Sequence, residues 1–368
     1  MGNSLGKLFK ISTFGESHGK GLGVIIDGCP AGLKISAEEI QQQLDRRKPG
    51  QSKITTDRAE VDQVQILSGI FDNTTLGTSI GLMIFNKDAK STAYLNIKDL
   101  YRPGHADLTY DARYGLRDWR GGGRASARET AARVAAGAIA GKMNHELTGM
   151  QTLAWVEQVH TIKADIDHQT ITPEEIEKNI VRCPDSQAAE KMITAITDAK
   201  KQGNSLGGII RFKVDQCPPG LGAPVFDKLT ADIAKACMSI PATRSISFGL
   251  GEKAAELTGL EHNDPLFLKN NQKIESLDNR AGGILGGISN GESLYGTISF
   301  KPTATIMHEQ KTVTCNFQET TFKASGRHDP CVLPRAVPIV EAMLNLVLAD
   351  HLLRYSVAKM SRLKRIFH

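Results

Sequence analysis

The chain has 368 residues and a net charge of +5, and 40% of its residues are hydrophobic and 23% charged. These values are typical of a globular protein with one large domain or two smaller ones, and they argue against a disordered chain. The longest apolar stretch, residues 336–349, contains Glu341 and Asn345 and is too short to span a bilayer, so we expect no membrane partner.

Six cysteines form no Cys-x-x-Cys pair, and no signal peptide precedes them. This pattern predicts reduced, mostly buried thiols in a cytoplasmic protein. No group of His, Cys, Asp and Glu has the spacing of a zinc or calcium site, so we expect no metal. Basic residues are dispersed and aromatic residues make up 5% of the chain, which disfavours a nucleic-acid-binding protein.

Helices are predicted where a capping residue precedes apolar residues at helical spacing. Ser36 with Glu39 opens the first helix, and Thr172 with Glu175 opens another. Further helices are expected at residues 185–202, 226–239 and 338–355. Strands are expected at residues 22–26, 62–67, 78–85, 209–215 and 295–300. Because glycine turns separate most strands, the sheets should be antiparallel, which favours an α+β fold over a doubly wound one.

The sequence contains a weak internal repeat. Residues 24–33 and 212–221 both consist of a predicted strand followed by Asp-x-Cys-Pro-x-Gly-Leu. Residues 77–80 resemble residues 296–299, and each half ends with an arginine-rich loop that leads into a long helix. Chance resemblance is the alternative.

If the repeat is real, the chain is one duplicated domain that spans residues 1–368. We predict that its two halves cover about residues 1–200 and 201–355 and pack as one body. Residues 356–368 then form a basic C-terminal tail.

Residues 120–130, Arg-Gly-Gly-Gly-Arg-Ala-Ser-Ala-Arg-Glu-Thr, lead into an alanine-rich helix. Three consecutive glycines let the backbone approach a ligand closely. Ser126 and Glu129 fit a capping box, which predicts a helix that begins near Ala127 with its positive dipole end at the glycine loop. Such a helix start, beside Arg124, suits a phosphate or a carboxylate. An ordinary helix start with solvated arginines is the alternative.

Two histidines precede this loop. His18, in Gly-Glu-Ser-His-Gly, is a candidate proton donor or phosphate ligand, since histidine titrates near neutrality. His105, in Arg-Pro-Gly-His, would more often be structural, but its proximity to the loop favours a functional role. Arg46 and Arg47 end the first predicted helix, where they either complement its dipole or bind an anion.

Three later segments carry further candidates. Residues 282–287 form a second glycine tract, and residues 301–305, Lys-Pro-Thr-Ala-Thr, suit a phosphate tail. Residues 326–330 place a cation, an imidazole and a carboxylate together, so Asp329 is either a base, a group that orients one, or half of a surface ion pair. The glycine tracts match neither a Walker A sequence nor a Rossmann fingerprint.

Three tracts, taken in this order and spacing, resemble the chorismate synthase family. They are Gly15-Glu-Ser-His-Gly19 with Asp27-Gly28-x-Pro30, then residues 117–130, then Gly326-Arg-His-Asp-Pro-Cys331. The resemblance extends to about Leu353. It implies a β-α-β sandwich with central helices between two antiparallel sheets, which agrees with the antiparallel prediction, and a homotetramer.

The resemblance also implies a lyase that eliminates phosphate from 5-enolpyruvylshikimate 3-phosphate, in a 1,4-anti reaction that gives chorismate. The reaction has no net redox change, yet the family requires reduced FMN (FMNH2), because no carbonyl group acidifies the C6 hydrogen. NADPH is expected only as a reductant of the flavin. An external flavin reductase is expected to supply the reduced FMN. A flavin-dependent oxidoreductase acting on a phosphorylated acid is the alternative.

By position, the catalytic residues of the family correspond to three residues of this chain. The resemblance implies that His18 lies near the substrate phosphate, that His105 protonates reduced flavin or tunes its charge, and that Asp329 lies near flavin N5. Ser17 and Ser126 support this network. The resemblance assigns contacts with FMN to Arg124, Ala125, Ser126, Pro241, Ala242, Gly286, Lys301, Pro302, Thr303, Ala304, Thr305 and Arg327.

Two basic positions that the family ties to NADP correspond to Arg47 and Lys53. Lysine stands at 53 where arginine is common, and it lacks the bidentate fork of arginine. The substrate carries roughly four negative charges and FMN about two more, which need cations in a water-poor site. The arginines that we expect to neutralise them are Arg46, Arg47, Arg128, Arg133, Arg327 and Arg335.

Overall fold

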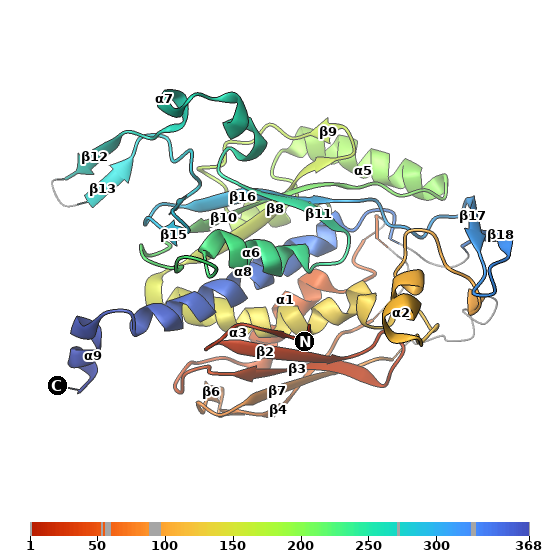
Figure 1. Cartoon of the computed structure of the whole chain (residues 1–368), viewed down its shortest axis with the longest axis horizontal. Coiled ribbons are helices and arrows are strands. Elements are labelled where there is room, and N and C mark those ends of the chain that lie inside the picture. Colours follow the sequence, from red (N-terminus) through yellow and green to blue (C-terminus); the bar gives the residue numbers. More distant parts are fainter. Residues whose placement is uncertain are drawn as a thin grey trace.

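The computed structural model describes residues 2–52, 54–55, 60–87, 97–270, 273–324 and 329–367. Two five-stranded antiparallel sheets lie on either side of a layer of helices (Figure 1). The first sheet has the order β1-β2-β3-β7-β4, with β1 (Ser4–Leu5), β2 (Lys10–Gly15), β3 (Gly21–Asp27), β7 (Ile80–Phe85) and β4 (Val64–Ser68). The second has the order β11-β16-β10-β8-β9, with β11 (Thr243–Phe248), β16 (Leu294–Phe300), β10 (Gly208–Asp215), β8 (Gln151–Val159) and β9 (Ile162–Lys163).

Both sheets turn apolar faces toward the helices. In β3 the side chains of Leu22, Val24 and Ile26 are fully buried, and in β10 Phe212 and Val214 are. This spacing of two is that of strands with one buried face. The prediction of an α+β sandwich with helices between antiparallel sheets is confirmed.

In the described part of the chain, the helical layer is made of α1 (Ala37–Arg47), α3 (Thr130–Thr148), α6 (Leu229–Met238) and α8 (Leu333–Ser356). Helices α3 and α8 lie against each other at their centres (Figure 1). A Cβ on Gly137 of α3 would lie 2.4 Å from the Cβ of Ala342, so small residues permit this close approach.

Helix α8 begins at Leu333, five residues before the predicted start, and it includes Pro338. It is long and apolar enough to cross a membrane, which corrects the expectation from residues 336–349, but 83% of its apolar window is buried. Burial of this kind is typical of a core helix.

The predicted capping boxes at Ser36 and Thr172 are both confirmed, at the starts of α1 and α4 (Pro173–Glu177). The helix expected at residues 185–202 is α5 (Ser186–Lys201), which Asp185 caps. The remaining elements are β5 (Ile70–Phe71), β6 (Thr74–Thr75), α2 (Asp107–Tyr114), η2 (Gly123–Ala125), η3 (Ala127–Glu129), η4 (Gly251–Glu256), α7 (Gly259–His262), β12 (Leu266–Lys269), β13 (Lys273–Ser276), β14 (Ile284–Leu285), β15 (Ile288–Ser289), β17 (Glu309–Val313), β18 (Glu319–Lys323) and α9 (Met360–Phe367).

Candidate active site

The glycine loop of residues 120–130 lies directly against the turn that carries His18. Gly121 has a φ of +77°, and a Cβ there would lie 2.4 Å from His18 Nδ1. Glycine is therefore needed at this position both for its backbone conformation and for the close approach. The chain then forms the short 3₁₀ turns η2 and η3, and helix α3 begins only at Thr130.

The predicted capping box at Ser126 is wrong. Ser126 Oγ accepts a hydrogen bond from the backbone N–H of Arg128 at 3.3 Å, two residues on rather than three. The Glu129 carboxylate accepts from Arg133 Nε at 3.1 Å, one helical turn later, so it does not reach back to Ser126. Ser126 thus caps the 3₁₀ turn η3 instead of the α-helix.

Ser17 and His18 lie in the turn between β2 and β3, where both are buried. Ser17 Oγ and His18 Nδ1 are 3.2 Å apart. The side-chain amide of Asn86 donates to the carbonyl oxygens of Glu16 and Gly19, each at 2.9 Å. These bonds hold the histidine turn against the sheet.

His105 is bonded at both ring nitrogens. Nδ1 lies 3.1 Å from Pro103 O, and because a carbonyl oxygen only accepts, Nδ1 carries the proton of the neutral ring. Nε2 lies 2.9 Å from Thr305 Oγ1, whose hydroxyl then donates to it. Burial, and after it the charge of Arg102, lowers the pKa of His105, so the ring is neutral at pH 7.

Arg102 fixes the segment that carries His105 onto the glycine loop. Its guanidinium donates to both carboxylate oxygens of Asp107 at 2.7 Å and to Gly121 O at 2.8 Å. Burial alone would raise the pKa of Asp107, but the hydrogen bonds from Arg102 lower it overall. Asp107 therefore stays ionised as the partner of Arg102.

Residues 301–305, which follow β16, pack directly against the His105 segment. Lys301 Nζ donates to Gly104 O at 3.2 Å, and a Cβ on Gly104 would lie 2.8 Å from the Cβ of Ala304. Thr303 Oγ1 donates to Asp329 O at 2.9 Å. Two segments almost 200 residues apart in sequence are thereby joined at the site.

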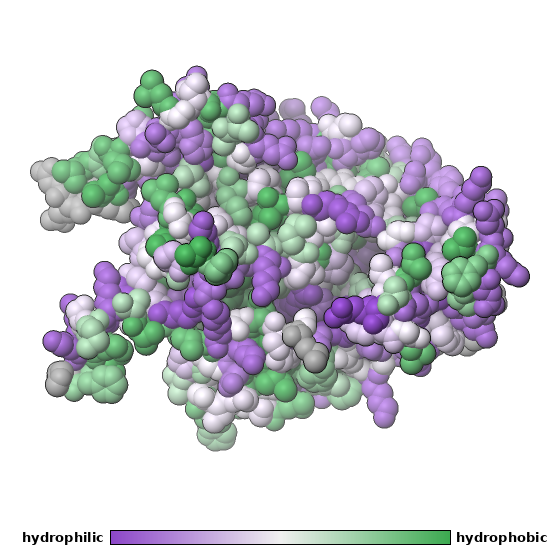
Figure 2. Space-filling model, in the orientation of Figure 1, coloured by the Kyte–Doolittle hydropathy of each residue, from purple (hydrophilic) through white to green (hydrophobic). Residues whose placement is uncertain are grey.

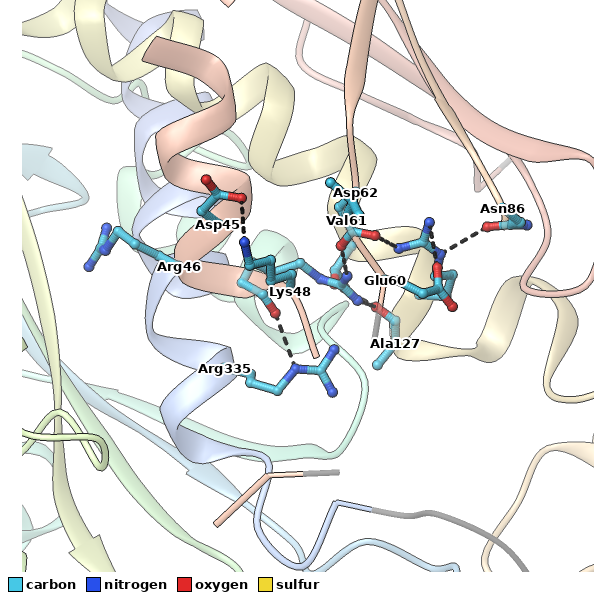
Figure 3. Close-up of polar contacts among 12 residues, drawn as sticks. Asp45, Arg46, Lys48, Glu60, Val61, Asp62, Asn86, Ala127 and Arg335 are labelled. Atoms are coloured by element: carbon cyan, nitrogen blue, oxygen red, sulfur yellow. Dashed lines mark hydrogen bonds and ion pairs between the residues drawn. The ribbon is translucent and has the colours of Figure 1, made fainter. Parts of the chain in front are cut away.

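Asp329 and Arg335 form an ion pair at the start of α8. Arg335 Nε also donates to the carbonyl oxygen of Arg47 at 3.1 Å, which joins α8 to the C-terminal end of α1 (Figure 3).

Arg47 and Arg128 are buried and share the carboxylate of Asp62. Arg47 Nη1 lies 2.8 Å from Asp62 Oδ2, and its Nη2 donates to Ala127 O at 2.8 Å. Arg128 pairs with the other oxygen of Asp62 and lies 2.9 Å from Glu60 Oε2. Burial lowers the pKa of Arg47 to about 10, against the opposing effect of Asp62, so Arg47 stays charged at pH 7.

These segments surround one cavity of about 1490 Å³. Pockets for single small molecules are typically about 300–1,000 Å³, so this cavity has room for two. Its described lining residues include nine lysines and arginines against five aspartates and glutamates. The predicted site residues that line it are His18, Arg47, His105, Arg124, Ala125, Ser126, Arg133, Pro241, Ala242, Lys301, Pro302, Thr303, Ala304, Thr305, Asp329 and Arg335.

Other predicted residues are not brought to this cavity. Arg46 points away from the Arg47 cluster (Figure 3), because adjacent helical residues do not face the same way. It pairs with Glu341 and, at 2.8 Å, with Glu177, beside a second cavity of about 490 Å³. Gly286 lies in the turn between β14 and β15 and is not among the described residues that line the cavity.

Four predicted residues need a separate account. Ser17 lies behind His18, and Arg128 is held in the acidic cluster rather than at the cavity. Arg327 and Lys53 lie outside the described residues.

Sequence analysis missed several residues that organise the site. Asp62, Glu60 and Asn86 occur in no recognisable motif, so no local signal marks them. Arg102 and Asp107 flank His105 in Arg-Pro-Gly-His-Ala-Asp, and this spacing of opposite charges across a turn was a usable signal.

Comparison with known proteins agrees over almost the whole chain. A family model described as chorismate synthase matches residues 9–353. Chorismate synthase of Synechocystis sp. is 57% identical and that of Nostoc punctiforme 55%, each over 355 residues that cover 96% of this chain and 98% of the relative. The chain belongs to the chorismate synthase family.

A solved structure extends this agreement to the fold. A crystal structure of chorismate synthase is similar with a TM-score of 0.73 and 31% identity, and the match covers 98% of this chain and 97% of that one. The activity of the family, and hence of this chain, is a carbon–oxygen lyase reaction in the shikimate pathway to aromatic amino acids: 1,4-anti elimination of phosphate from 5-enolpyruvylshikimate 3-phosphate to give chorismate. The family uses reduced flavin for this reaction.

Proposed function

We propose that the 1490 Å³ cavity holds reduced FMN and 5-enolpyruvylshikimate 3-phosphate side by side. The observation that carries the proposal is the convergence of His18, His105, Arg124 and Asp329 on this one cavity. The excess of cations over carboxylates in its lining suits two ligands that together carry roughly six negative charges.

Residues 301–305 and the start of the glycine loop are suited to FMN. Lys301 offers a cation, and Thr303 and Thr305 offer hydroxyls, all on one segment that lines the cavity. Arg124 lines it as well, and donates to Gly15 O at 3.0 Å and to Thr13 Oγ1 at 2.7 Å, so its guanidinium is held in place. When bound, reduced FMN supplies electron density to the allylic system of the substrate and recovers it.

Arg133, Arg335 and Arg47 are our candidates for the anionic groups of the substrate. All three line the cavity, and Arg133 Nη1 donates to Ser239 Oγ at 2.7 Å, which orients it. Any of these cations that binds the departing phosphate more strongly as its charge develops raises the rate as well as the affinity.

His18 is the proposed proton donor to the leaving phosphate, with Ser17 supporting its Nδ1. His105, neutral in the free cavity, is proposed to take and return a proton beside the cofactor, since an anionic ligand there would raise its affinity for protons. Asp329 is proposed to help move the C6 proton, with Arg335 orienting its carboxylate.

The cellular setting follows from the family resemblance. We propose a cytoplasmic homotetramer that receives its reduced FMN from an external flavin reductase, with NADPH only as the reductant of the flavin. The NADP contact at Lys53 and the FMN contacts at Gly286 and Arg327 remain predictions.

An anaerobic assay tests the proposal. The chain is incubated with reduced FMN and 5-enolpyruvylshikimate 3-phosphate while phosphate release and the diene absorbance of chorismate are followed. We expect many turnovers for each reduced flavin. Stoichiometric consumption of reduced flavin would favour the alternative, a flavin-dependent oxidoreductase.

A pair of variants locates the cofactor. Arg124→Ala should weaken FMN binding at least tenfold in a flavin fluorescence titration, because a held guanidinium is lost from the cavity. Arg120→Ala is the matched control, since Arg120 lies in the same loop but pairs with Asp118 and does not line the cavity. Equal affinities for FMN in the two variants would contradict the placement.

A further inference from the structure

Asn86 lies directly beside the turn that carries His18. It follows the last residue of β7, which pairs with β3, and its backbone N–H donates to Lys20 O at 3.1 Å. The turn is closed by a hydrogen bond of 3.2 Å from the N–H of Gly19 to Glu16 O, and His18 is one of the two residues between them. The first sheet thus fixes the place of Asn86 next to this turn.

The side-chain amide of Asn86 holds the turn at both of its ends. Nδ2 donates to Glu16 O and to Gly19 O, each at 2.9 Å. A side-chain amide has two N–H donors, so both are used on this one turn. Asn86 therefore fixes the direction in which the His18 side chain leaves the backbone.

The oxygen of the same amide joins the turn to the buried arginines. Asn86 Oδ1 accepts from Arg128 Nε at 2.9 Å, and Asn86 points toward the cluster that contains Asp62 (Figure 3). Asp62 is the carboxylate that Arg128 shares with Arg47, which lines the cavity. One uncharged side chain thus connects the turn of His18 with a cationic wall of the cavity.

The position of His18 matters because the cavity is open to water. Figure 2 shows the molecule hollowed beside α2, with hydrophilic side chains around the hollow, and Asp107, Tyr110 and Arg113 of α2 line the cavity. A general acid has to lie about 2.6–3.2 Å from the atom that it protonates. A displacement of about 1 Å can lower a rate about 100-fold.

We propose that Asn86 is a positioning residue for the elimination. By fixing the histidine turn onto the arginine cluster, it keeps the imidazole of His18 within reach of the leaving phosphate. The inference rests on the proposed role of His18 as the proton donor. It adds that this role depends on a residue that belongs to no motif and that acts on the rate rather than on the affinity for the substrate.

Asn86→Asp tests the donating end of the amide. The carboxylate still accepts from Arg128 Nε, but it places an oxygen against the two carbonyl oxygens of the turn. In the anaerobic assay we expect kcat to fall about 10–100-fold, while KM for the substrate and the affinity for FMN stay within about threefold. An unchanged kcat, or a loss seen only in KM, would overturn the inference.

Asn279→Asp is the matched control. Asn279 Nδ2 donates to Ser293 O at 2.8 Å and its Oδ1 accepts from the N–H of Gly283 at 2.7 Å, so this amide also holds backbone together. Asn279 is not among the described residues that line the cavity. This variant should lose stability but keep kcat within about twofold, so an equal fall in kcat in the two variants would show that Asn86 is merely structural.

A double-variant cycle shows whether Asn86 acts through His18. In a His18→Ala background, Asn86→Asp should change kcat less than about threefold, because the group that it positions is already absent. The same fold loss in both backgrounds would overturn the inference and leave the role of His18 intact. Wild-type turnover of His18→Ala would instead overturn the proposed proton donor, and the inference with it.

Asn86→Ala gives an independent version of the same cycle. It removes both donors without adding a charge, and we expect the same dependence on His18. Circular dichroism and melting temperature show whether each variant is folded, and the alanine variant decides the question if the aspartate variant does not fold.

Discussion

Two turns, called corners below, follow β3 at residues 28–33 and β10 at residues 216–221. They have the same hydrogen bonds, although they lie in different halves of the chain. In the first corner the Thr75 hydroxyl donates to Pro30 O at 2.6 Å and accepts from the backbone N–H of Leu33 at 3.0 Å. In the second, the Ser289 hydroxyl makes the same two bonds, at 2.7 and 2.9 Å, to the proline and leucine in equivalent positions. Chance resemblance of two sequences does not explain a shared bonding pattern of this kind, which supports the proposed duplication.

The order of the strands supports it further. Read from opposite ends, β4-β7-β3-β2 corresponds to β11-β16-β10-β8, with β3 and β10 at the centres of their sheets. In each half one helix follows the corner, and a long helix ends the unit. Since β8 begins at Gln151, a boundary near residue 150 fits these sheets better than the predicted boundary near 200.

What differs between the halves is what each brings to the cavity. Helix α1, after the first corner, ends in Arg47, which pairs with the buried carboxylate of Asp62. Helix α6, after the second corner, leads into Ile240, Pro241 and Ala242, which line the cavity without charge. The helices that follow the two corners thus supply different surfaces to the cavity, a cation from α1 and apolar contacts from the residues after α6.

The largest effect is expected where each half contributes a proposed proton-transfer group. His105→Ala should lower turnover by about two orders of magnitude, the usual scale for a general acid or base, and Asp329→Asn should abolish activity with FMN still bound. Turnover in the anaerobic assay and FMN affinity by fluorescence are measured together. Near-wild-type turnover in either variant would remove the substituted residue from the proposed chemistry.

The buried cluster at the end of α1 should make the first half the more sensitive to loss of one charge. Asp62→Asn leaves Arg47 and Arg128 without their shared carboxylate, which should cost about 3–5 kcal/mol in the free energy of unfolding. The control is Asp45→Asn in the exposed pair with Lys48, which should cost less than about 1 kcal/mol. Urea unfolding checks both, and similar costs for the two variants would show that the cluster is not stabilising.

The two corners allow a matched test of the duplication. Thr75→Val and Ser289→Ala each remove a hydroxyl that bonds a proline carbonyl and a buried backbone N–H, so each should cost about 1–3 kcal/mol. If the corners are equivalent, the two losses in the free energy of unfolding should agree to within about 1 kcal/mol. A large loss at one corner and none at the other would argue that the bonding pattern is coincidental.

Acidification should weaken the fold through histidines in both halves. Burial is the first cause of the lowered pKa of His105 and of His351, and for His351 it outweighs the hydrogen bond with Asp232. The unfolded chain, with histidine pKa values near about 6.5, binds more protons than the folded chain below that pH. The free energy of unfolding should therefore be flat above pH 7.5 and fall as the pH drops from about 6.5 to 5.5.

Urea midpoints across that range measure the effect, and His105→Gln should reduce the slope. Carboxylates with lowered pKa values lose their contribution only at more acidic pH, so they do not obscure it. A stability that rises on acidification to pH 5.5 would contradict the assigned neutral state of the buried histidines.

Local patterns predicted the fold well, because caps and strand alternation depend on near neighbours. Ser36 and Thr172 form their capping boxes, whereas Ser126 does not, because Glu129 finds a partner in Arg133 that only the folded helix presents. The sequence match between residues 77–80 and residues 296–299 was also misaligned, because only the folded chain shows which residues are equivalent. The equivalence of Thr75 with Ser289 places residue 77 opposite residue 291, rather than opposite residue 296 as the sequence match had it.

Motifs predicted His18, His105 and Asp329 as cavity residues, but not which arginines are already neutralised. Arg128 meets Glu60 and Asp62 across more than 60 residues of chain, and no local pattern reports a contact of that range. The number of cations in a sequence therefore overstates the positive charge that a ligand meets, because some of those cations are neutralised by carboxylates within the fold.

The smallest effect concerns the cysteine thiols. Cys29 and Cys217 occupy equivalent positions in the two corners. Burial raises the pKa of Cys29 to about 11 and of Cys217 to about 12, and each lies 3.8 Å from the carbonyl oxygen of the proline that follows it. Cys315 is the only partly exposed cysteine of the six.

In the native chain at pH 8 we expect one thiol to react rapidly with a disulfide reagent, without loss of stability, because a neutral buried thiol is a poor nucleophile. Cys315→Ser should remove that reaction, and Cys29 and Cys217 should become reactive together as the chain unfolds in urea. If one of these two cysteines reacted at a lower urea concentration than the other, the two halves would unfold separately. A domain packed as one body does not unfold in this way.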